Sequence, residues 1–430
     1  MLSTITLFIE FLALAFMESS SYEERPAALI IVLIALFSLA FLYDISRSTV
    51  LRKYSAPLFC GYLLRVFLVF FDIYGRSFYS LPNSGADSEM FYYNAVQFIN
   101  GLNGSSGAFI TLTGTIMKWV GVSRLFVQFI LMLFSVVAII FAAKTMEYVV
   151  ADKRTKQVTI FILCLLPNFA ILSCIYLRES VVAMLLSISF YCFVRWVNRG
   201  REGFFWLAFI FVFAAARFHS GVVGVAMGYI VARMLYDKED GRFEFAAKSV
   251  ITAAFFLLVF AYLYLNYADT LFGKMVNIES VEDISSGVGM GGSTYAQYVG
   301  NSSTPLNMVI YTIPRMLYFL FSPFPWQWRG LSDIIAFCFS SLFFLWTAIN
   351  TVRYLKNKYP ENRAVVMGLS IVALCTLFIF AWGTSNTGTA IRHRDKAIVL
   401  YGILWCCTRI PRTSRRCITN GKSFGNYTGL

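Results

Sequence analysis

The only two histidines of the chain lie in two short, arginine-containing segments, each beside an apolar run. Residues 217–221 read RFHSG and contain His219, whereas residues 392–396 read RHRDK and contain His393. A guanidinium group next to lipid is costly unless it meets an anion or water. A neutral imidazole can accept a proton from a hydroxyl group. The two segments therefore predict a site that binds an anionic ligand, such as a lipid-linked diphosphate.

The composition indicates that these residues belong to a membrane protein. Hydrophobic residues make up 58% of the 430 residues and charged residues only 14%, where soluble domains hold about a quarter charged residues. The net charge of +13 does not indicate nucleic-acid binding, because most Lys and Arg lie in short loops beside apolar runs. The nine cysteines include no CxxC motif and no Cys/His cluster. We therefore expect no metal site and no disulfide framework.

Apolar runs predict an all-α polytopic integral membrane protein with about twelve transmembrane helices. Two ionisable residues in the middle of these runs, Glu10 and Arg65, are expected to pair, since pairing would reduce the cost of burying each charge. The runs lie near residues 2–17, 27–43, 56–72, 124–146, 158–175, 180–196, 203–216, 221–235, 249–266, 332–350, 364–382 and 396–409.

The charge of the loops predicts which ends of the helices face the cytoplasm. Basic residues concentrate in cytoplasmic loops, and 23 of the 36 Lys and Arg residues lie in segments 44–55, 144–157, 195–202, 233–248, 351–363 and the C-terminal tail. Both termini are therefore expected in the cytoplasm. This alternation requires that segments 106–121 and 306–322 do not cross fully, so we predict re-entrant or interfacial helices there.

The predicted organisation is one transmembrane domain over residues 1–408, followed by a basic cytoplasmic tail over 409–430. Extracytoplasmic loops are expected near 73–123 and 267–331. Twelve further cations can lie at or above the outer surface, and arginine suits bidentate binding of phosphate oxygens. Each such arginine could instead cap a helix or extend toward lipid headgroups. The candidate diphosphate ligands are Arg178, Arg217, Arg315, Arg329, Arg392, His393 and Arg394.

Three residues are candidates for a general base. His219 lies beside Arg217, whose charge favours the neutral imidazole. Asp87 and Glu89 precede or open an amphipathic helix expected over 88–100. The structural alternatives are an N-cap role for Asp87 and a hydrogen-bonded helix-start role for His219.

Glu179 follows Arg178 directly, and because adjacent residues do not meet on a helix, each must find another partner.

Aromatic residues near the same face are candidates for binding sugar rings. Trp326 and Trp328 lie in the segment 322–329, which reads SPFPWQWR, and Tyr92 and Tyr93 lie on the helix expected over 88–100. Flat aromatic faces can pack against sugar rings, but Trp is also enriched at the lipid headgroup level.

These segments resemble bacterial surface-polysaccharide polymerases of the Wzy type, including the EpsG-like group. The resemblance spans roughly residues 55–400 and is carried by residues 82–89, 178–179, 217–220, 322–326 and 388–394. It implies a GT-C-like glycosyltransferase of the bacterial inner membrane with its active site on the extracytoplasmic face. O-antigen, capsule or exopolysaccharide repeats linked to undecaprenyl diphosphate would be joined there without a cofactor. Partners would be the lipid-linked oligosaccharide, a flippase and a chain-length regulator, with no nucleic acid.

Two alternatives share parts of this pattern. An O-antigen ligase, or another polyprenyl-phosphate-dependent glycosyltransferase, would use the same arginines with a different acceptor. A polysaccharide or lipid transporter should show interrupted helices and polar groups near the middle of the membrane. In this sequence the polar residues gather at one face, which favours a glycosyltransferase.

Overall fold

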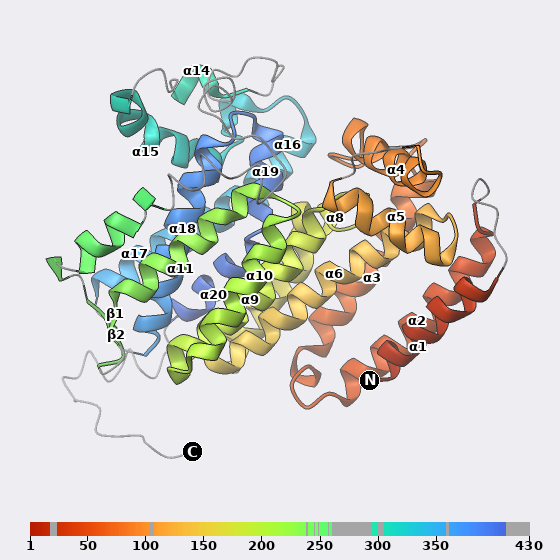
Figure 1. The fold of residues 1–430 in the computed structure, drawn as a ribbon, viewed down its shortest axis with the longest axis horizontal. Coiled ribbons are helices and arrows are strands. Elements are labelled where there is room, and N and C mark those ends of the chain that lie inside the picture. Colours follow the sequence, from red (N-terminus) through yellow and green to blue (C-terminus); the bar gives the residue numbers. More distant parts are fainter. Residues whose placement is uncertain are drawn as a thin grey trace.

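The computed structural model describes residues 1–17, 24–102, 107–237, 240–244, 246–247, 249–256, 258–259, 294–299, 305–357 and 361–409. This part of the chain forms the all-α membrane protein that the sequence predicts (Figure 1). Six helical segments within it are long and apolar enough to cross a membrane. They are α2 (Ala27–Arg47), η1 with α3 (Arg52–Tyr54 and Ser55–Tyr74), α6 with η2 (Arg124–Thr145 and Met146–Tyr148), α9 (Glu179–Arg199), α18 (Arg363–Trp382), and the continuous segment of α16 (Leu331–Ile335), the π-helical turn η6 (Ala336–Ser341) and α17 (Leu342–Lys356).

The remaining helices are shorter. Apolar helices of 10–17 residues fall short of the roughly 20 residues that a bilayer crossing needs. Helices do form at both segments predicted as re-entrant or interfacial, as α5 (Ala108–Val120) and α15 (Pro305–Phe321). The others are α1 (Leu2–Phe16), α4 (Ala86–Ile99), α7 (Lys153–Leu165), α8 (Pro167–Leu172), α10 (Glu202–Ala216), η3 (Ser220–Val222), α11 (Val223–Leu235), α14 (Ala296–Val299), η5 (Pro325–Gln327), α19 (Thr387–Asp395) and α20 (Ile398–Cys407).

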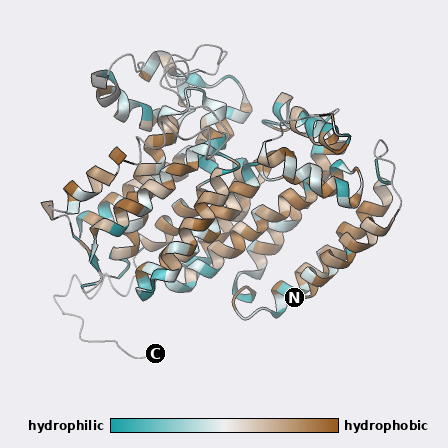
Figure 2. Cartoon of the chain, in the orientation of Figure 1, coloured by the Kyte–Doolittle hydropathy of each residue, from teal (hydrophilic) through white to brown (hydrophobic). Residues whose placement is uncertain are grey.

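Helices α6 and α9 form the centre of the bundle and lie side by side. In their apolar windows 78% and 72% of residues are buried, against 39–50% in the other four long segments. Large apolar side chains on outer helices are exposed, including Leu39, Phe67 and Ile210. Figure 2 shows hydrophobic residues along the length of the bundle. An exposed apolar surface of this extent fits contact with lipid.

The break between α7 and α8 is filled by a buried arginine. Pro167 begins α8 and has no N–H to donate to the carbonyl of Leu163, four residues earlier. Arg65 of α3, which is fully buried, donates to the carbonyl oxygen of Cys164 at 2.6 Å and reaches that of Leu163 at 3.5 Å. The expected pairing of Arg65 with Glu10 is therefore wrong. The interrupted helix supplies the polar partners instead.

A second interruption separates α19 from α20 and lies deep in the bundle. Asn386 caps α19, because its side-chain oxygen accepts from the amides of Gly388 and Thr389 at 2.9 and 3.2 Å. Lys396 follows α19 and is buried. Helix α11 packs closely on α18: a Cβ on Gly228 would lie 2.5 Å from the Cα of Val372. Such close approach is a common use of glycine in membrane helices.

The loops that the sequence predicted as cytoplasmic meet at one end of the bundle. Asn362 donates to the carbonyls of Val150 and Cys407 at 2.8 and 3.1 Å, and Asn198 donates to that of Tyr148 at 3.2 Å. The ribbon of β1 (Tyr236–Asp237) and β2 (Arg242–Phe243) lies at this end too. Helices α4, α16 and α19 lie toward the opposite end (Figure 1). The candidate site residues are also found there.

Candidate functional site

The two histidines come together at that second end. Nε2 of His219 lies 3.0 Å from Nε2 of His393. His219 is placed by the turn between α10 and α11, where its Nδ1 accepts from the amide of Gly221 at 3.2 Å. His393 is placed by α19, and its Nδ1 lies 3.0 Å from Oγ1 of Thr384. Both rings also pack against Phe380 of α18.

Beside the histidines, Arg392 joins three elements through two carboxylates. Its Nη1 lies 2.5 Å from Oδ2 of Asp87 on α4. Its Nε and Nη2 lie 3.2 and 3.1 Å from Oε1 of Glu179, at the start of α9. The Glu179 side chain is buried, with 5% exposed, whereas that of Asp87 is 54% exposed. Arg392 therefore has a fixed, buried partner on one side and an accessible one on the other.

Two further cations surround Glu179. Nζ of Lys396 lies 3.3 Å from the same Oε1 atom. Arg178, the residue before Glu179, stacks its guanidinium 5.9 Å from the ring centre of Phe91 on α4. Arg392, Arg178 and Lys396 thus gather around Glu179 and Asp87, and we call these five residues the Arg392 cluster. Basic groups gathered at the end of a helical bundle attract anions.

A separate ion-pair network holds α4 to the bundle. Glu89 of α4 accepts two hydrogen bonds from Arg124 at the start of α6, both at 2.8 Å, and also pairs with Arg76. The hydrogen bonds from Arg124 and the contact with Arg76 lower the pKa of Glu89 to about 2. Arg76 in turn contacts Asp72 at 3.3 Å. These contacts make Glu89 a very weak base and a strong tether.

Arg315 and Arg394 are more deeply buried than Arg392. Arg394 is buried and donates to the carbonyls of Leu320 and Ser322 at 2.8 and 2.6 Å. Arg315 is also buried; it donates to Oγ of Ser385 at 3.1 Å and lies over the Trp382 ring. Their contacts join α15 and α19 to neighbouring segments. Both arginines therefore help to hold α15 and α19 in position.

The other predicted residues lie around this region. Arg217 is exposed at the end of α10, two residues before His219. Arg329 is exposed and pairs with Asp333 at 3.9 Å. Trp326 and Tyr93 are each 62% exposed, whereas two others make polar contacts: Trp328 donates to the carbonyl of Pro323 at 3.2 Å and Tyr92 bonds Glu24.

Two further polar residues complete the site. The Thr- and Ser-rich stretch from Thr384 to Thr389 was expected to offer hydroxyl and N–H groups to sugars or phosphate, but Thr384 instead bonds His393. Sequence reasoning missed Gln128, which donates to Asp72 at 2.7 Å beside the network of Glu89. Gln128 lies inside an apolar run, where one buried polar residue is itself a signal of a partner.

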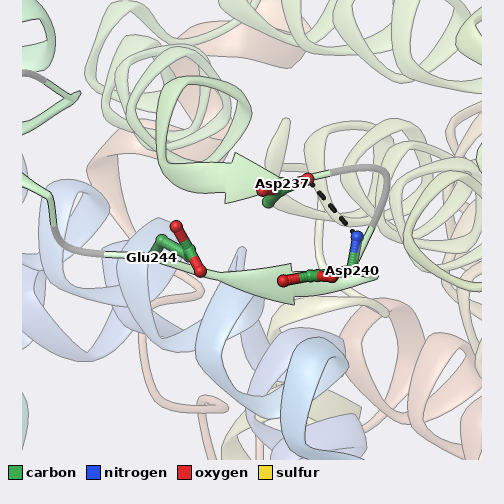
Figure 3. A group of neighbouring side chains, drawn as sticks. All are labelled: Asp237, Asp240 and Glu244. Atoms are coloured by element: carbon green, nitrogen blue, oxygen red, sulfur yellow. Dashed lines mark hydrogen bonds between the residues drawn. The ribbon is translucent and has the colours of Figure 1, made fainter.

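One acidic group lies at the opposite end of the bundle. Asp237, Asp240 and Glu244 have carboxylate oxygens within 4.8 Å of one another (Figure 3). Arg242 lies among them, 2.5 Å from Asp240 and 2.9 Å from Glu244. Two of the three carboxylates thus already share a guanidinium partner, which occupies oxygens that a metal ion would need.

Comparison with protein-family models, with curated proteins and with solved structures found no match.

Proposed function

We propose that this protein is a glycosyltransferase that polymerises oligosaccharide repeat units carried on undecaprenyl diphosphate. One observation carries the proposal: Arg392 is held by buried Glu179 while its outer side faces the accessible carboxylate of Asp87. A diphosphate oxygen can take the place of that carboxylate. Arginine's planar fork suits such an exchange between carboxylate and phosphate.

In this proposal the Arg392 cluster stabilises the leaving group. As the bond between sugar and diphosphate breaks, negative charge collects on the diphosphate. Arg392, Arg178 and Lys396 lie within one cluster around Glu179, so positive charge is already in position when it is needed. Arg217 and Arg329, both exposed nearby, are proposed to guide or hold the outer phosphate. Arg315 and Arg394 are proposed to hold α15 and α19 in position around the cluster.

The acceptor hydroxyl needs a base, and the histidine pair is the proposed one. A useful base has a pKa near the working pH, which disfavours Glu89 with its pKa near 2. In this proposal Glu89 holds α4 to the bundle. The Asp87 carboxylate pairs with Arg392 until the diphosphate binds. Exposed Trp326 and Tyr93, with Tyr92 and Trp328, are proposed to contact the sugars.

We further propose that the protein lies in the bacterial inner membrane with this end facing the periplasm or cell exterior. The support is the clustering of the basic loops at the opposite end, which the positive-inside rule assigns to the cytoplasm. In a GT-C-like arrangement of about twelve crossings, α5 and α15 would be re-entrant or interfacial. A flippase and a chain-length regulator would be its partners.

A transporter or flippase of lipid-linked sugars is a second candidate. The interruptions at Pro167 and at Lys396 favour it, because transporters build substrate sites from discontinuous helices. An O-antigen ligase would share the Arg392 cluster and differ only in its acceptor.

Reconstitution distinguishes these functions. Purified protein in liposomes receives the host's own undecaprenyl-diphosphate repeat unit, and products are resolved on a gel. Release of undecaprenyl diphosphate with a ladder spaced by one repeat supports the polymerase. Transfer only to a lipid A–core acceptor supports a ligase. Movement of intact substrate across the bilayer, with no new glycosidic bond, would contradict both.

A further inference from the structure

The hydrogen bonds of His219 fix the position of its proton. The amide nitrogen of Gly221 lies 3.2 Å from Nδ1 of His219, and a backbone amide can only donate. Nδ1 must therefore present its lone pair. In a neutral imidazole the single N–H is then on the other nitrogen, so His219 carries its proton on Nε2.

The proton on His219 determines the state of His393. Nε2 of His219 donates across the 3.0 Å contact, so Nε2 of His393 must be the acceptor. The N–H of a neutral His393 is then on Nδ1, where it donates to Oγ1 of Thr384 at 3.0 Å. For two neutral rings this is the one arrangement that satisfies all three contacts. If the protons were reversed, His219 Nδ1–H would face the N–H of Gly221.

We infer that His393 is the general base of the proposed glycosyl transfer and that Thr384 is its positioning residue. The inference rests on the proposed function. The lone pair on Nε2 of His393 is directed at a donor, which is His219 in this structure and would be the acceptor hydroxyl during the reaction. Thr384 holds the opposite nitrogen, as the third member of a nucleophile–base–orienter set does. His219 is then the donor that the acceptor hydroxyl replaces.

In the proposed step the acceptor oxygen forms a bond to the anomeric carbon while its proton moves to Nε2 of His393. The bond between the anomeric carbon and the diphosphate oxygen breaks, and its electron pair stays on the diphosphate beside Arg392. His393 becomes an imidazolium, still anchored to Thr384 through Nδ1–H. It later returns the proton to water or to the departing diphosphate.

The surroundings of the pair support this assignment. Arg392 and Arg394 flank His393 on α19, and Arg217 precedes His219 by two residues. The His393 ring packs against Phe380 of α18 as well as bonding Thr384, so its orientation is restricted on both sides. Space beside the rings is tight: a Cβ on Gly221 would lie 2.5 Å from Phe380 and 3.2 Å from the His219 ring. The turn at Gly221 therefore lies directly against Phe380 and the His219 ring.

The proton positions can be tested without any activity. The chain contains only two histidines, so ¹⁵N-histidine labelling in nanodiscs gives four ring-nitrogen signals. We expect one ring, assigned to His219 by its loss in His219→Asn, to be protonated on Nε2. The other should be protonated on Nδ1, with a coupling between the two Nε2 atoms. Thr384→Val should mix the tautomers of His393, and Thr384→Ser should restore them. A His393 protonated on Nε2 in the wild-type protein would overturn the inference.

Activity variants supply the second test, in the liposome assay. His393→Asn should lower kcat by about 10²-fold or more, the usual contribution of a general base, and His219→Asn should lower it by much less. Thr384→Val should lower kcat with little change in KM, and Thr384→Ser should recover it. The matched control is Thr347→Val, because Thr347 is buried on α17 and bonds only its own helix in the contacts described; it should behave as wild type.

The outcomes separate the two proposals. Wild-type protein with the expected tautomers but no transfer activity would contradict the proposed function. An active wild type whose His393→Asn variant is equally active would contradict the inference and leave the function intact. A larger loss in His219→Asn than in His393→Asn would assign the base to His219.

Discussion

Arg392 binds one oxygen of Glu179 through two guanidinium nitrogens, although 213 residues separate the two in sequence. Lys396 lies 3.3 Å from the same oxygen, so two basic side chains share a single buried carboxylate. Glu179 opens α9 and Arg392 lies on α19. The start of α9 is thus joined directly to α19. Removing the Glu179 carboxylate should therefore weaken the packing of both helices.

Glu179→Gln should destabilise the protein strongly. The change leaves Lys396, which is fully buried, and Arg392, which is mostly buried, with a neutral partner. Breaking a buried pair in this way costs about 3–5 kcal/mol. Thermal unfolding in detergent measures the loss. Glu244→Gln is the matched control, since Glu244 is 42% exposed in its pair with Arg242, and a loss as large as that of Glu179→Gln would contradict the stated role of burial.

Arg392→Lys should weaken the binding of undecaprenyl diphosphate even though the charge is kept. Lysine offers a point charge and cannot bridge Glu179 and an oxyanion with one planar group. Losing one charge-assisted hydrogen bond of about 1.5–3 kcal/mol lowers affinity by roughly 10–100-fold. Binding to protein in nanodiscs checks this. Arg242→Lys at the other end should leave affinity unchanged, and full affinity in Arg392→Lys would remove Arg392 from the diphosphate site.

Asp87→Asn should raise the affinity for undecaprenyl diphosphate, whereas Arg392→Lys should lower it. If the Asp87 carboxylate occupies the place of an oxyanion on Arg392, its neutralisation removes a competitor. Affinity for undecaprenyl diphosphate should rise, by up to about tenfold for each 1.4 kcal/mol of competition removed. Asp240→Asn is the control on the opposite end. Unchanged affinity together with a large fall in kcat would instead support Asp87 as the base.

The helices themselves were largely predictable because hydropathy is a property of contiguous sequence. The run at 27–43 became α2, Ala27–Arg47, and the run at 364–382 became α18, Arg363–Trp382. The number of full membrane crossings was less predictable from sequence than the helices. Within the described residues six segments reach spanning length, and runs such as 158–175 are divided, because Pro167 ends α7.

The partners of the charged residues were not predictable from sequence. Arg65 lies in a run where Glu10 was the available counter-charge, yet it bonds carbonyls that only the broken helix leaves open. Asp87 was weighed as a helix cap, but Gly85 holds that position and Asp87 faces Arg392 instead. Tertiary packing decides such choices, since a polar group beside an apolar core takes whichever partner the fold brings within reach.

The attachment of α4 should depend on pH through Glu89. The pKa of Glu89 falls from its ordinary value of 4.5 to about 2 in the folded protein. A lowered carboxyl pKa stabilises the fold above the unfolded-state value, and the effect is lost as pH falls through the folded-state value. The tether should therefore persist at pH 5 and weaken between about pH 4.5 and 2. Hydrogen exchange of the α4 amides measures it, and Glu89→Gln should expose α4 at every pH. Equal protection in both proteins would contradict the tether.

The two ends of the bundle should label from opposite sides of the membrane. Met90 on α4 is 50% exposed at the site end, and Ser46 at the end of α2 is exposed at the other. In a background where the exposed Cys60 and Cys338 are replaced by Ala, Met90→Cys should react with a membrane-impermeant thiol reagent in intact cells. Ser46→Cys should react only in inverted vesicles, because the basic loops on its side are held in the cytoplasm. If both label from one side, the ends do not lie across a bilayer. If the sides are reversed, the Arg392 cluster faces the cytoplasm, and a polymerase supplied from the outer leaflet is ruled out.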